Sequence, residues 1–357
     1  MKNTDLGWDD FYATHFEEFR SQGLFALRIL RENREQYTAC GDLGEFTCEV
    51  TGKFRFEKLQ KSQFPTVGDW VAVSVIPNEQ KAMIHAVLPR KSMLSRKVAG
   101  EVTEEQPVAA NIDTIFIVMG LDLNFNLRRL ERFLALARNS GAAPVVLLNK
   151  SDLCAEAKQR MLEVESIAAG VDVYALSAIN RADLDKLQKY VKPAKTIAFI
   201  GSSGVGKSTL INALLDTEAL SVNAVSALGN RGRHTTTYRE LFVLTGGAML
   251  IDTPGMREIQ VWGDDEILEQ VFEEISEFGT HCRFKDCSHQ NEPGCAVQEA
   301  IRNGDLDPQR LQSYLKLKKE TSFLSDRQTM KASAVEKSRW KKISEQSRKL
   351  KKSRRIL

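Results

Sequence analysis

The residues best suited to chemistry form a glycine-rich segment with the pattern G-x-x-x-x-G-K-S. In order they are Gly201, Ser202, Ser203, Gly204, Val205, Gly206, Lys207 and Ser208, and Thr209 follows directly. Glycines let backbone N–H groups wrap a phosphate, and a helix beginning at the lysine adds a favourable dipole. We expect all nine residues to bind a nucleotide. Lys207 would reach the β- and γ-phosphates and act in catalysis, and Ser208 would bind Mg²⁺.

A second motif, N-K-x-D, lies about fifty residues earlier, at Asn149, Lys150, Ser151 and Asp152. The Asp152 carboxylate can accept hydrogen bonds from the N1 and N2 donors of guanine. Adenine lacks that donor pair, so a site built around the carboxylate selects guanine. Ser177 and Ala178, after the next predicted strand, match the short loop that backs the guanine base. The expected guanine site therefore consists of residues 149–152 together with Ser177 and Ala178.

A third motif, D-x-x-G, follows another buried segment at Asp252 and Gly255. Asp252 is expected to touch Mg²⁺ through water, and Gly255 to offer its N–H to the γ-phosphate. Each of these motifs directly follows a segment that is predicted to be a strand. Open α/β sheets bind ligands at the carboxyl ends of their strands. The motifs therefore predict one site for GTP and Mg²⁺.

The residue that hydrolyses GTP is less evident, because Met256 occupies the position where Ras-like proteins carry a water-orienting Gln. Between the glycine-rich segment 201–208 (the P-loop) and Asp252, the only plausible source of the switch threonine that binds Mg²⁺ is the run Thr235–Thr237. Thr236 is favoured, and a polar loop with no ligand is the alternative. The adjacent His234 is the nearest titratable candidate to orient the attacking water. A plain loop residue remains the alternative for His234.

The order of the motifs is reversed, because N-K-x-D normally lies C-terminal to the P-loop. This order predicts a circularly permuted GTPase. The permutation moves the strand that would follow D-x-x-G to the start of the domain. The segment after Gly255 is therefore expected to lead directly to the next domain and to move it with the nucleotide state.

A metal site is predicted by the pattern C-x4-C-x-H-x5-C at Cys282, Cys287, His289 and Cys295. Three thiolates and one imidazole suit a single, closed, tetrahedral structural zinc site with no position for water. A redox or purely structural cysteine cluster is the alternative. The other three cysteines, Cys40, Cys48 and Cys154, fit strand or core positions.

The 357 residues carry a formal net charge of +3, but residues 337–357 hold ten Lys/Arg and one Glu, a local charge of +9. Such a block binds nucleic acid or forms a solvated end. The first ten residues contain three Asp and no apolar core, which argues against a signal peptide. No apolar run approaches the ~20 residues of a membrane span. We expect a cytoplasmic protein that contacts no membrane.

The first hundred residues read as short alternating segments separated by turns, which suits a small closed barrel such as an OB-fold. The predicted strands are Leu24–Leu30, Gln36–Cys40, Glu45–Val50, Phe54–Leu59, Asp69–Val75 and Lys81–Leu88. Four cations at the barrel's exit, Arg90, Lys91, Arg96 and Lys97, slightly favour RNA contact. A barrel with only a packing role is the alternative.

From Asp113 the pattern changes to alternating buried strands and amphipathic helices, which predicts a parallel α/β sheet with helices on both faces. The strands are expected at 114–119, 144–148, 171–176, 196–200, 240–244 and 248–251, and the helices at 127–140, 155–170, 181–191 and 207–215. The predicted domains are a lead-in and barrel (1–107), a permuted G domain (108–262), a mostly helical zinc-binding domain (263–330) and a basic tail (331–357).

With these motifs in this order, the chain resembles the ribosome small-subunit-dependent GTPase A family over nearly its whole length. The resemblance implies an OB-fold, a permuted G domain and a zinc domain. It also implies a role in late maturation of the 30S ribosomal subunit, with GTP hydrolysis to GDP and phosphate stimulated by that particle. That family shows the same apolar residue after D-x-x-G and the same switch histidine, which supports His234. The expected partners are GTP or GDP, the 30S subunit and 16S rRNA, without DNA, and a monomer is expected.

Two other functions compete with this interpretation. The chain could be a nucleotide-gated rRNA-binding module in which hydrolysis is incidental; comparing turnover with and without 30S particles separates the two. A P-loop kinase or ATPase is the third candidate, and the N-K-x-D motif argues against it. Competition between GTP and ATP tests that point.

Overall fold

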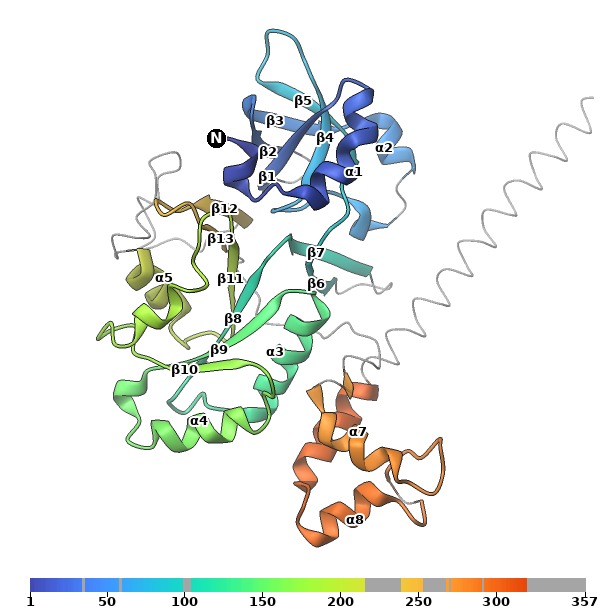
Figure 1. The fold of residues 1–357 in the computed structure, drawn as a ribbon, viewed down its shortest axis with the longest axis vertical. Helices are drawn as coiled ribbons and strands as arrows, with labels where there is room; N and C mark the ends of the chain where they lie inside the picture. Colours follow the sequence, from blue (N-terminus) through green and yellow to red (C-terminus); the bar gives the residue numbers. More distant parts are fainter. Residues whose placement is uncertain are drawn as a thin grey trace, which may run out of the picture.

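The computed structural model describes residues 1–33, 36–57, 60–98, 104–215, 239–252, 268–269, 271–290 and 292–319. Figure 1 shows an N-terminal barrel, a central sheet with its helices, and a C-terminal group of helices beside helix α3. The helices of the described residues include none that is both long enough and apolar enough to cross a membrane.

The N-terminal region is a closed five-stranded barrel, as the alternating segments predict. Its strands are β1 (Phe25–Asn33), β2 (Gln36–Gly41), β3 (Gly44–Val50), β4 (Trp70–Val75) and β5 (Lys81–Val87). They lie in the order β1-β2-β3-β5-β4, and pairing of β1 with β4 closes the barrel. Alternation fills the interior: in β3, Phe46, Cys48 and Val50 are buried, while the intervening residues face outward. A short 3-10 helix η1 (Asn3–Leu6) and helix α1 (Asp10–Ser21) precede the barrel.

The predicted strand Phe54–Leu59 is wrong, because helix α2 (Gly52–Glu57) occupies most of that segment. The Phe54/Phe56 alternation resembles a strand, but only Phe54 is buried, while Phe56 is 86% exposed. The Thr51 hydroxyl accepts from the Phe54 N–H (3.1 Å) and so helps to start the helix. The other five predicted segments, Leu24–Leu30 among them, correspond to the five barrel strands. A 3-10 turn η2 (Lys61–Gln63) precedes β4.

A hairpin that sequence reasoning missed, β6 (Met93–Val98) with β7 (Glu104–Ala110), joins the barrel to the central domain. Of the four cations predicted at this exit, Arg90 is not available to RNA. Its guanidinium donates to both carboxylate oxygens of Asp69 (2.8 and 2.7 Å), and its side chain is 14% exposed. Lys91 pairs with Asp9. The side chains of Arg96 and Lys97 lie outside the described residues.

The central sheet has the strand order β10-β9-β8-β11-β13-β12. Its strands are β8 (Thr114–Gly120), β9 (Ala143–Asn149), β10 (Asp172–Ala175), β11 (Thr196–Ile200), β12 (Arg239–Val243) and β13 (Met249–Asp252). All pairings are parallel except β12 with β13, which is antiparallel at the edge. The fold class predicted from the sequence is confirmed, with this one edge strand reversed.

Helices cover both faces of the sheet, because every residue of β8 is buried and alternate residues join different cores. One core includes residues of α3 (Leu127–Asn139) and α4 (Ala157–Glu165), and the other includes residues of α5 (Lys207–Leu215) and the 3-10 turn η4 (Leu184–Leu187). The helix predicted at 181–191 is therefore only this short turn. A further turn, η3 (Ser151–Leu153), follows β9.

Besides the β6–β7 hairpin, strand pairing and a buried arginine connect the barrel to the central domain. Strand β1 pairs with β12, so that the two sheets form one continuous set of strands. Arg28 of β1 is 2% exposed and donates to the carbonyls of Leu6 (2.5 Å), Gly68 (3.1 Å) and Asn111 (3.1 Å), and to the Thr196 hydroxyl (3.0 Å). Burial lowers the pKa of Arg28 to about 10.

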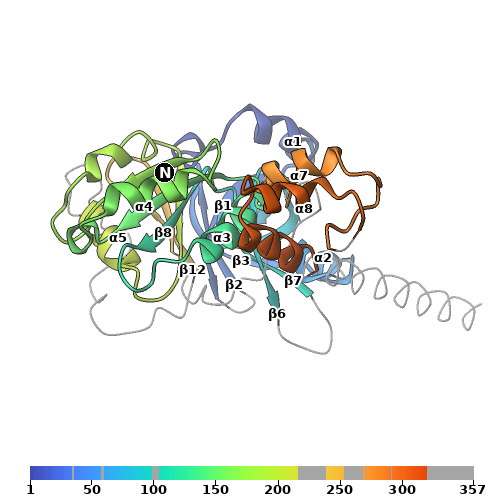
Figure 2. The same ribbon diagram turned by 90° about the horizontal axis from the view of Figure 1, so that it is seen from below.

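The C-terminal region is helical, with α7 (Glu273–Thr280), α8 (Ala296–Asn303) and a helix at 308–319. Its core contains Ala135 from α3. At the same junction the buried Arg310 donates to Glu131 of α3 (2.8 Å) and to the Val271 carbonyl (2.6 Å), and it also pairs with Glu274. Both views place α3 between the sheet and this helical group (Figures 1 and 2).

Candidate functional site

The glycine-rich segment begins where β11 ends and leads into α5, as predicted. Gly201, Gly204 and Gly206 all have positive φ angles (145°, 79° and 94°). A Cβ atom on Gly201 would lie 2.2 Å from the Val118 carbonyl oxygen, so any larger residue at position 201 would clash with strand β8. The Lys207 ammonium donates to the carbonyls of Gly201 (2.7 Å) and Ser202 (2.6 Å), which holds it over the loop.

Asn149 joins this loop to the other predicted guanine-site loops. Its side chain is buried, and its amide donates to the Val205 carbonyl (2.9 Å), while its carbonyl oxygen accepts from the Ala178 N–H (3.0 Å). A Cβ on Gly206 would lie 2.3 Å from the Asn149 amide nitrogen, so this close approach also requires glycine. Asn149 therefore fixes three segments that are distant in sequence.

The acidic residue of N-K-x-D, Asp152, lies beside the predicted backing loop. Ser177 is buried and its hydroxyl donates to Asp152 Oδ1, while the Ser177 oxygen accepts from the Asn180 N–H (3.2 Å). Among the described residues, Asp152 Oδ2 receives no hydrogen bond. The geometry thus fixes one carboxylate oxygen and leaves the other able to accept from a base.

Two residues at this edge escaped the sequence analysis. Asp122, just beyond the end of β8, accepts from the Lys150 ammonium (2.6 Å), which also donates to the Gly204 carbonyl (2.7 Å). The hydrogen bond from Lys150 lowers the pKa of Asp122. Arg129 of α3 donates to the Ser202 hydroxyl (3.1 Å). For Asp122, the available signal was an acidic residue three positions after the buried run 114–119.

The predicted Mg²⁺ side is described only in part. Ser208 and Thr209 are exposed in the first turn of α5, and Asp252 is the last residue of β13. Strands β11 and β13 are parallel neighbours, so Ser208 and Asp252 lie at the same edge of the sheet. His234, Thr236, Gly255 and Met256 lie outside the described residues.

The predicted metal ligands, Cys282, Cys287, His289 and Cys295, come together: one ligand atom from each lies within 4.8 Å of the others. The Cys282 and Cys295 sulfurs are 3.8 Å apart, and each is 3.6 Å from His289 Nδ1. Ligands on a tetrahedral zinc ion, at 2.0–2.3 Å from the metal, would be about 3.5–3.8 Å apart. The arrangement therefore fits a zinc ion.

The surroundings of the cluster act differently on its ligands. Burial opposes ionisation of the Cys282 thiol, but N–H groups of Val297 and Ala296 and hydrogen bonds with the Cys295 and Cys287 thiols outweigh it, and the pKa of Cys282 is lowered. Burial raises the pKa of Cys287 to about 11. Burial lowers the pKa of His289, which favours the neutral imidazole that a metal needs. Gln298 donates to the His289 carbonyl (2.6 Å) and so holds the residue in place.

Comparison with known proteins agrees with this geometry. A family model described as RsgA GTPase matches residues 87–262. The chain is 44% identical to the small ribosomal subunit biogenesis GTPase RsgA of Opitutus terrae, over 96% of each chain. It is 42% identical to the protein of that name from Syntrophotalea carbinolica, over 98% of this chain and 97% of the relative.

Solved structures give the same answer. YjeQ from Thermotoga maritima has a TM-score of 0.59 and 28% identity, and the match covers 84% of this chain and 98% of that one. YloQ, described as a circularly permuted GTPase, has a TM-score of 0.58 and 25% identity, over 84% and 95% of the two chains. The chain belongs to the RsgA GTPase family and is a circularly permuted GTP hydrolase.

Proposed function

We propose that this GTPase acts on the small (30S) ribosomal subunit during late maturation, that the particle stimulates GTP hydrolysis, and that hydrolysis is coupled to release. The GTP-binding part of the proposal is carried by Asn149, which joins the P-loop, the N-K-x-D segment and the Ser177–Ala178 loop. The relatives' name, small ribosomal subunit biogenesis GTPase, supports the partner.

In this proposal the P-loop residues 201–208 and Thr209 bind the phosphates, and Asp152 reads guanine, backed by Ser177 and Ala178. Lys150 covers the base while Asp122 holds its ammonium group. GTP binds with Mg²⁺, as the family implies. Ser208 and Thr236 would be direct ligands of the ion, and Asp252 would act through water, where the ion neutralises charge on the phosphates.

Hydrolysis needs a group that Met256 cannot provide. We assign to Lys207 the neutralisation of charge that develops on the β- and γ-phosphates, and to His234 the orientation of the attacking water. Gly255 would contact the γ-phosphate through its N–H. If a His234→Ala variant kept full 30S-stimulated turnover, His234 would have no catalytic part.

The cysteine–histidine cluster would hold one structural Zn²⁺ per chain. With four protein ligands, the ion would have no open position for substrate, so it would supply folding energy rather than catalysis. Metal analysis of the purified protein is the check, and less than ~0.3 zinc per chain would count against the site.

Three surfaces would contact 16S rRNA: the barrel, the metal-binding domain and the basic residues 331–357, which lie outside the described residues. The protein would work as a cytoplasmic monomer without DNA or membrane partners. Phosphate contacts should make binding fall steeply with salt. Turnover measured with 30S, 50S and 70S particles at several salt concentrations tests the function, and equal slow rates throughout would indicate an RNA-binding module with incidental hydrolysis.

A further inference from the structure

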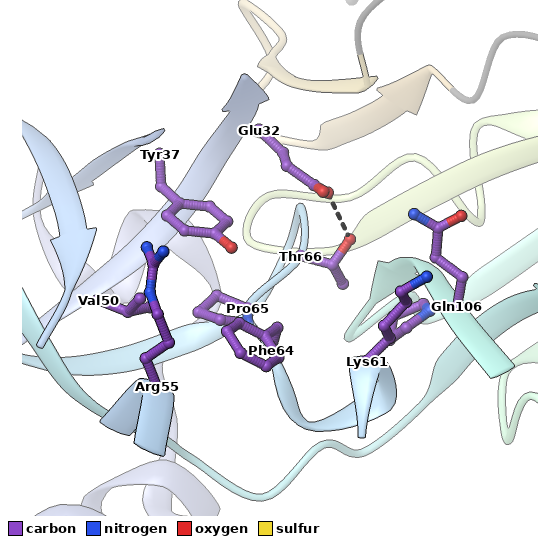
Figure 3. Close-up of a pocket in the computed structure, with 10 residues that line it drawn as sticks. Glu32, Tyr37, Val50, Arg55, Lys61, Phe64, Pro65, Thr66 and Gln106 are labelled. Carbon is purple, nitrogen blue, oxygen red and sulfur yellow. Dashed lines mark hydrogen bonds between the residues drawn. The ribbon is translucent and has the colours of Figure 1, made fainter. Parts of the chain in front are cut away.

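A pocket of about 260 Å³ opens where the barrel meets strand β7, and none of its lining residues belongs to the nucleotide edge or the metal cluster. Its walls come from β1, β2, β3, α2, the segment around η2 and β7 (Figure 3). Pockets for drug-sized ligands usually measure about 300–1,000 Å³. This one therefore suits a compact ligand such as a single base.

The lining combines aromatic rings with cations. Tyr37 is 5% exposed, and Phe64 is half-buried and packs edge-on against Phe54 with ring centroids 5.7 Å apart. Arg55 and Lys61 are exposed and lie on opposite sides of the pocket in Figure 3. Proteins bind single-stranded nucleic acid with this combination, in which bases stack on rings and cations meet the phosphates.

A carboxylate completes the pocket. Glu32 Oε2 accepts from the Thr66 hydroxyl (3.1 Å) and lies 3.4 Å from the Arg239 guanidinium, whereas Oε1 accepts no hydrogen bond from any described residue. A carboxylate oxygen pairs with an exocyclic amine, as on cytosine N4. It repels the carbonyl that uracil presents in place of that amine.

We propose that this pocket binds one unpaired nucleotide of RNA. The base lies against Tyr37 and Phe64, Arg55 and Lys61 hold the flanking phosphates, and Glu32 accepts from the amino group of adenine or cytosine. The inference deepens the proposed function, since the RNA would belong to the small subunit.

The test uses the full chain and a tetraribonucleotide containing 8-azidoadenosine, which is cross-linked by light and mapped by mass spectrometry. Mapping separates the pocket from the basic tail. We expect cross-links on peptides within 36–66, competed away better by oligo(A) and oligo(C) than by oligo(U). Cross-links found only in 320–357, or none, would overturn the proposal.

Variants sharpen this test. Phe64→Leu keeps an apolar side chain but removes a ring, and should weaken binding on the order of 5- to 150-fold. Glu32→Gln should remove the preference over oligo(U). Arg55→Gln with Lys61→Gln should reduce the slope of log affinity against log salt by about 1.4.

Lys53→Gln is the matched control on α2, where the side chain is 83% exposed and does not line the pocket. A preference unchanged in Glu32→Gln, or a slope equally reduced in Lys53→Gln, would refute the assignment.

The two proposals fail in different ways. Normal stimulation of GTPase activity by 30S particles, without cross-links in the pocket, would refute the pocket alone. No stimulation by 30S particles would refute the proposed function, and the pocket would then be judged by its cross-links with free RNA.

Discussion

Replacing Arg310 by Met should loosen the C-terminal helical region from helix α3 of the central domain. Arg310 is 5% exposed, and it donates to Glu131 of α3 and stacks over the Phe272 ring, 4.5 Å from the centroid. Glu131 is fully buried, and its Oε2 has no hydrogen-bond partner among the described residues. Without Arg310, the one ion pair left to Glu131 within the part of the chain that the structure describes would be that with Arg128 (2.6 Å).

Breaking a buried ion pair by removing one partner costs about 3–5 kcal/mol, because the remaining charge stays buried. Because Arg128 still compensates part of the Glu131 charge, we expect a cost near the lower end of this range, about 3–4 kcal/mol. Local opening of α3, α7 and α8 should therefore increase on the order of 10²- to 10³-fold, as measured by hydrogen exchange of their amides. Arg302→Met, at an exposed position on α8, is the matched control and should change the opening free energy by less than about 0.5 kcal/mol.

A second variant separates the charge effect from a loss of packing. Combining Arg310→Met with Glu131→Leu removes both buried charges, and such replacements are often neutral or stabilising. The double variant should recover at least about 2 kcal/mol relative to Arg310→Met alone. Exchange rates within threefold of wild type in Arg310→Met, or no recovery in the double variant, would refute this account of the junction.

Three further predictions concern the two sites. Asp152→Asn should weaken GTP binding on the order of 100-fold and shift the nucleotide preference toward xanthosine triphosphate, because the C2 carbonyl of xanthine can accept a hydrogen bond from the new amide. A competition assay with labelled GDP measures this preference, and an unchanged preference would contradict the assignment of Asp152 to guanine. Asp122→Ala should weaken GDP binding severalfold, because it frees the Lys150 ammonium group. Since the pKa of Asp122 is lowered, the wild-type protein should lose the Asp122–Lys150 ion pair only as the pH falls below about 4. A loss of GDP binding between pH 8 and 5 would point to another group. A strong chelator, or Cys282→Ser, should remove hydrogen-exchange protection from residues 271–319 while GTP binding persists. The control Cys154→Ser should change neither the protection nor GTP binding. Protection that survives demonstrated loss of the metal would contradict a structural role for the metal.

Local patterns predicted the structure best. The glycine-rich turn after β11, the buried strand at 114–119 and the clustering of Cys282, Cys287, His289 and Cys295 were all predicted from local patterns, because each depends on residues that are close in sequence. The alternation also predicts the barrel, although the sixth predicted strand, Phe54–Leu59, lies mostly in helix α2.

The contacts that connect distant segments could not be read from the sequence. Arg90 looks like a surface cation but is used by Asp69, and Asp122 has no motif of its own. The link between the central domain and the C-terminal helical region is a further example. The direct route expected after Gly255 lies outside the described residues, and the contacts that are described run through α3, where Arg129 meets the P-loop and Glu131 meets Arg310.

The most direct test of the central claim is GTP turnover by the purified protein, measured alone and with 30S, 50S or 70S particles at matched salt. We predict slow intrinsic turnover and a large stimulation by 30S particles that is not matched by 50S particles. Equal slow rates under all conditions would contradict the assignment of a GTPase that works on the small subunit.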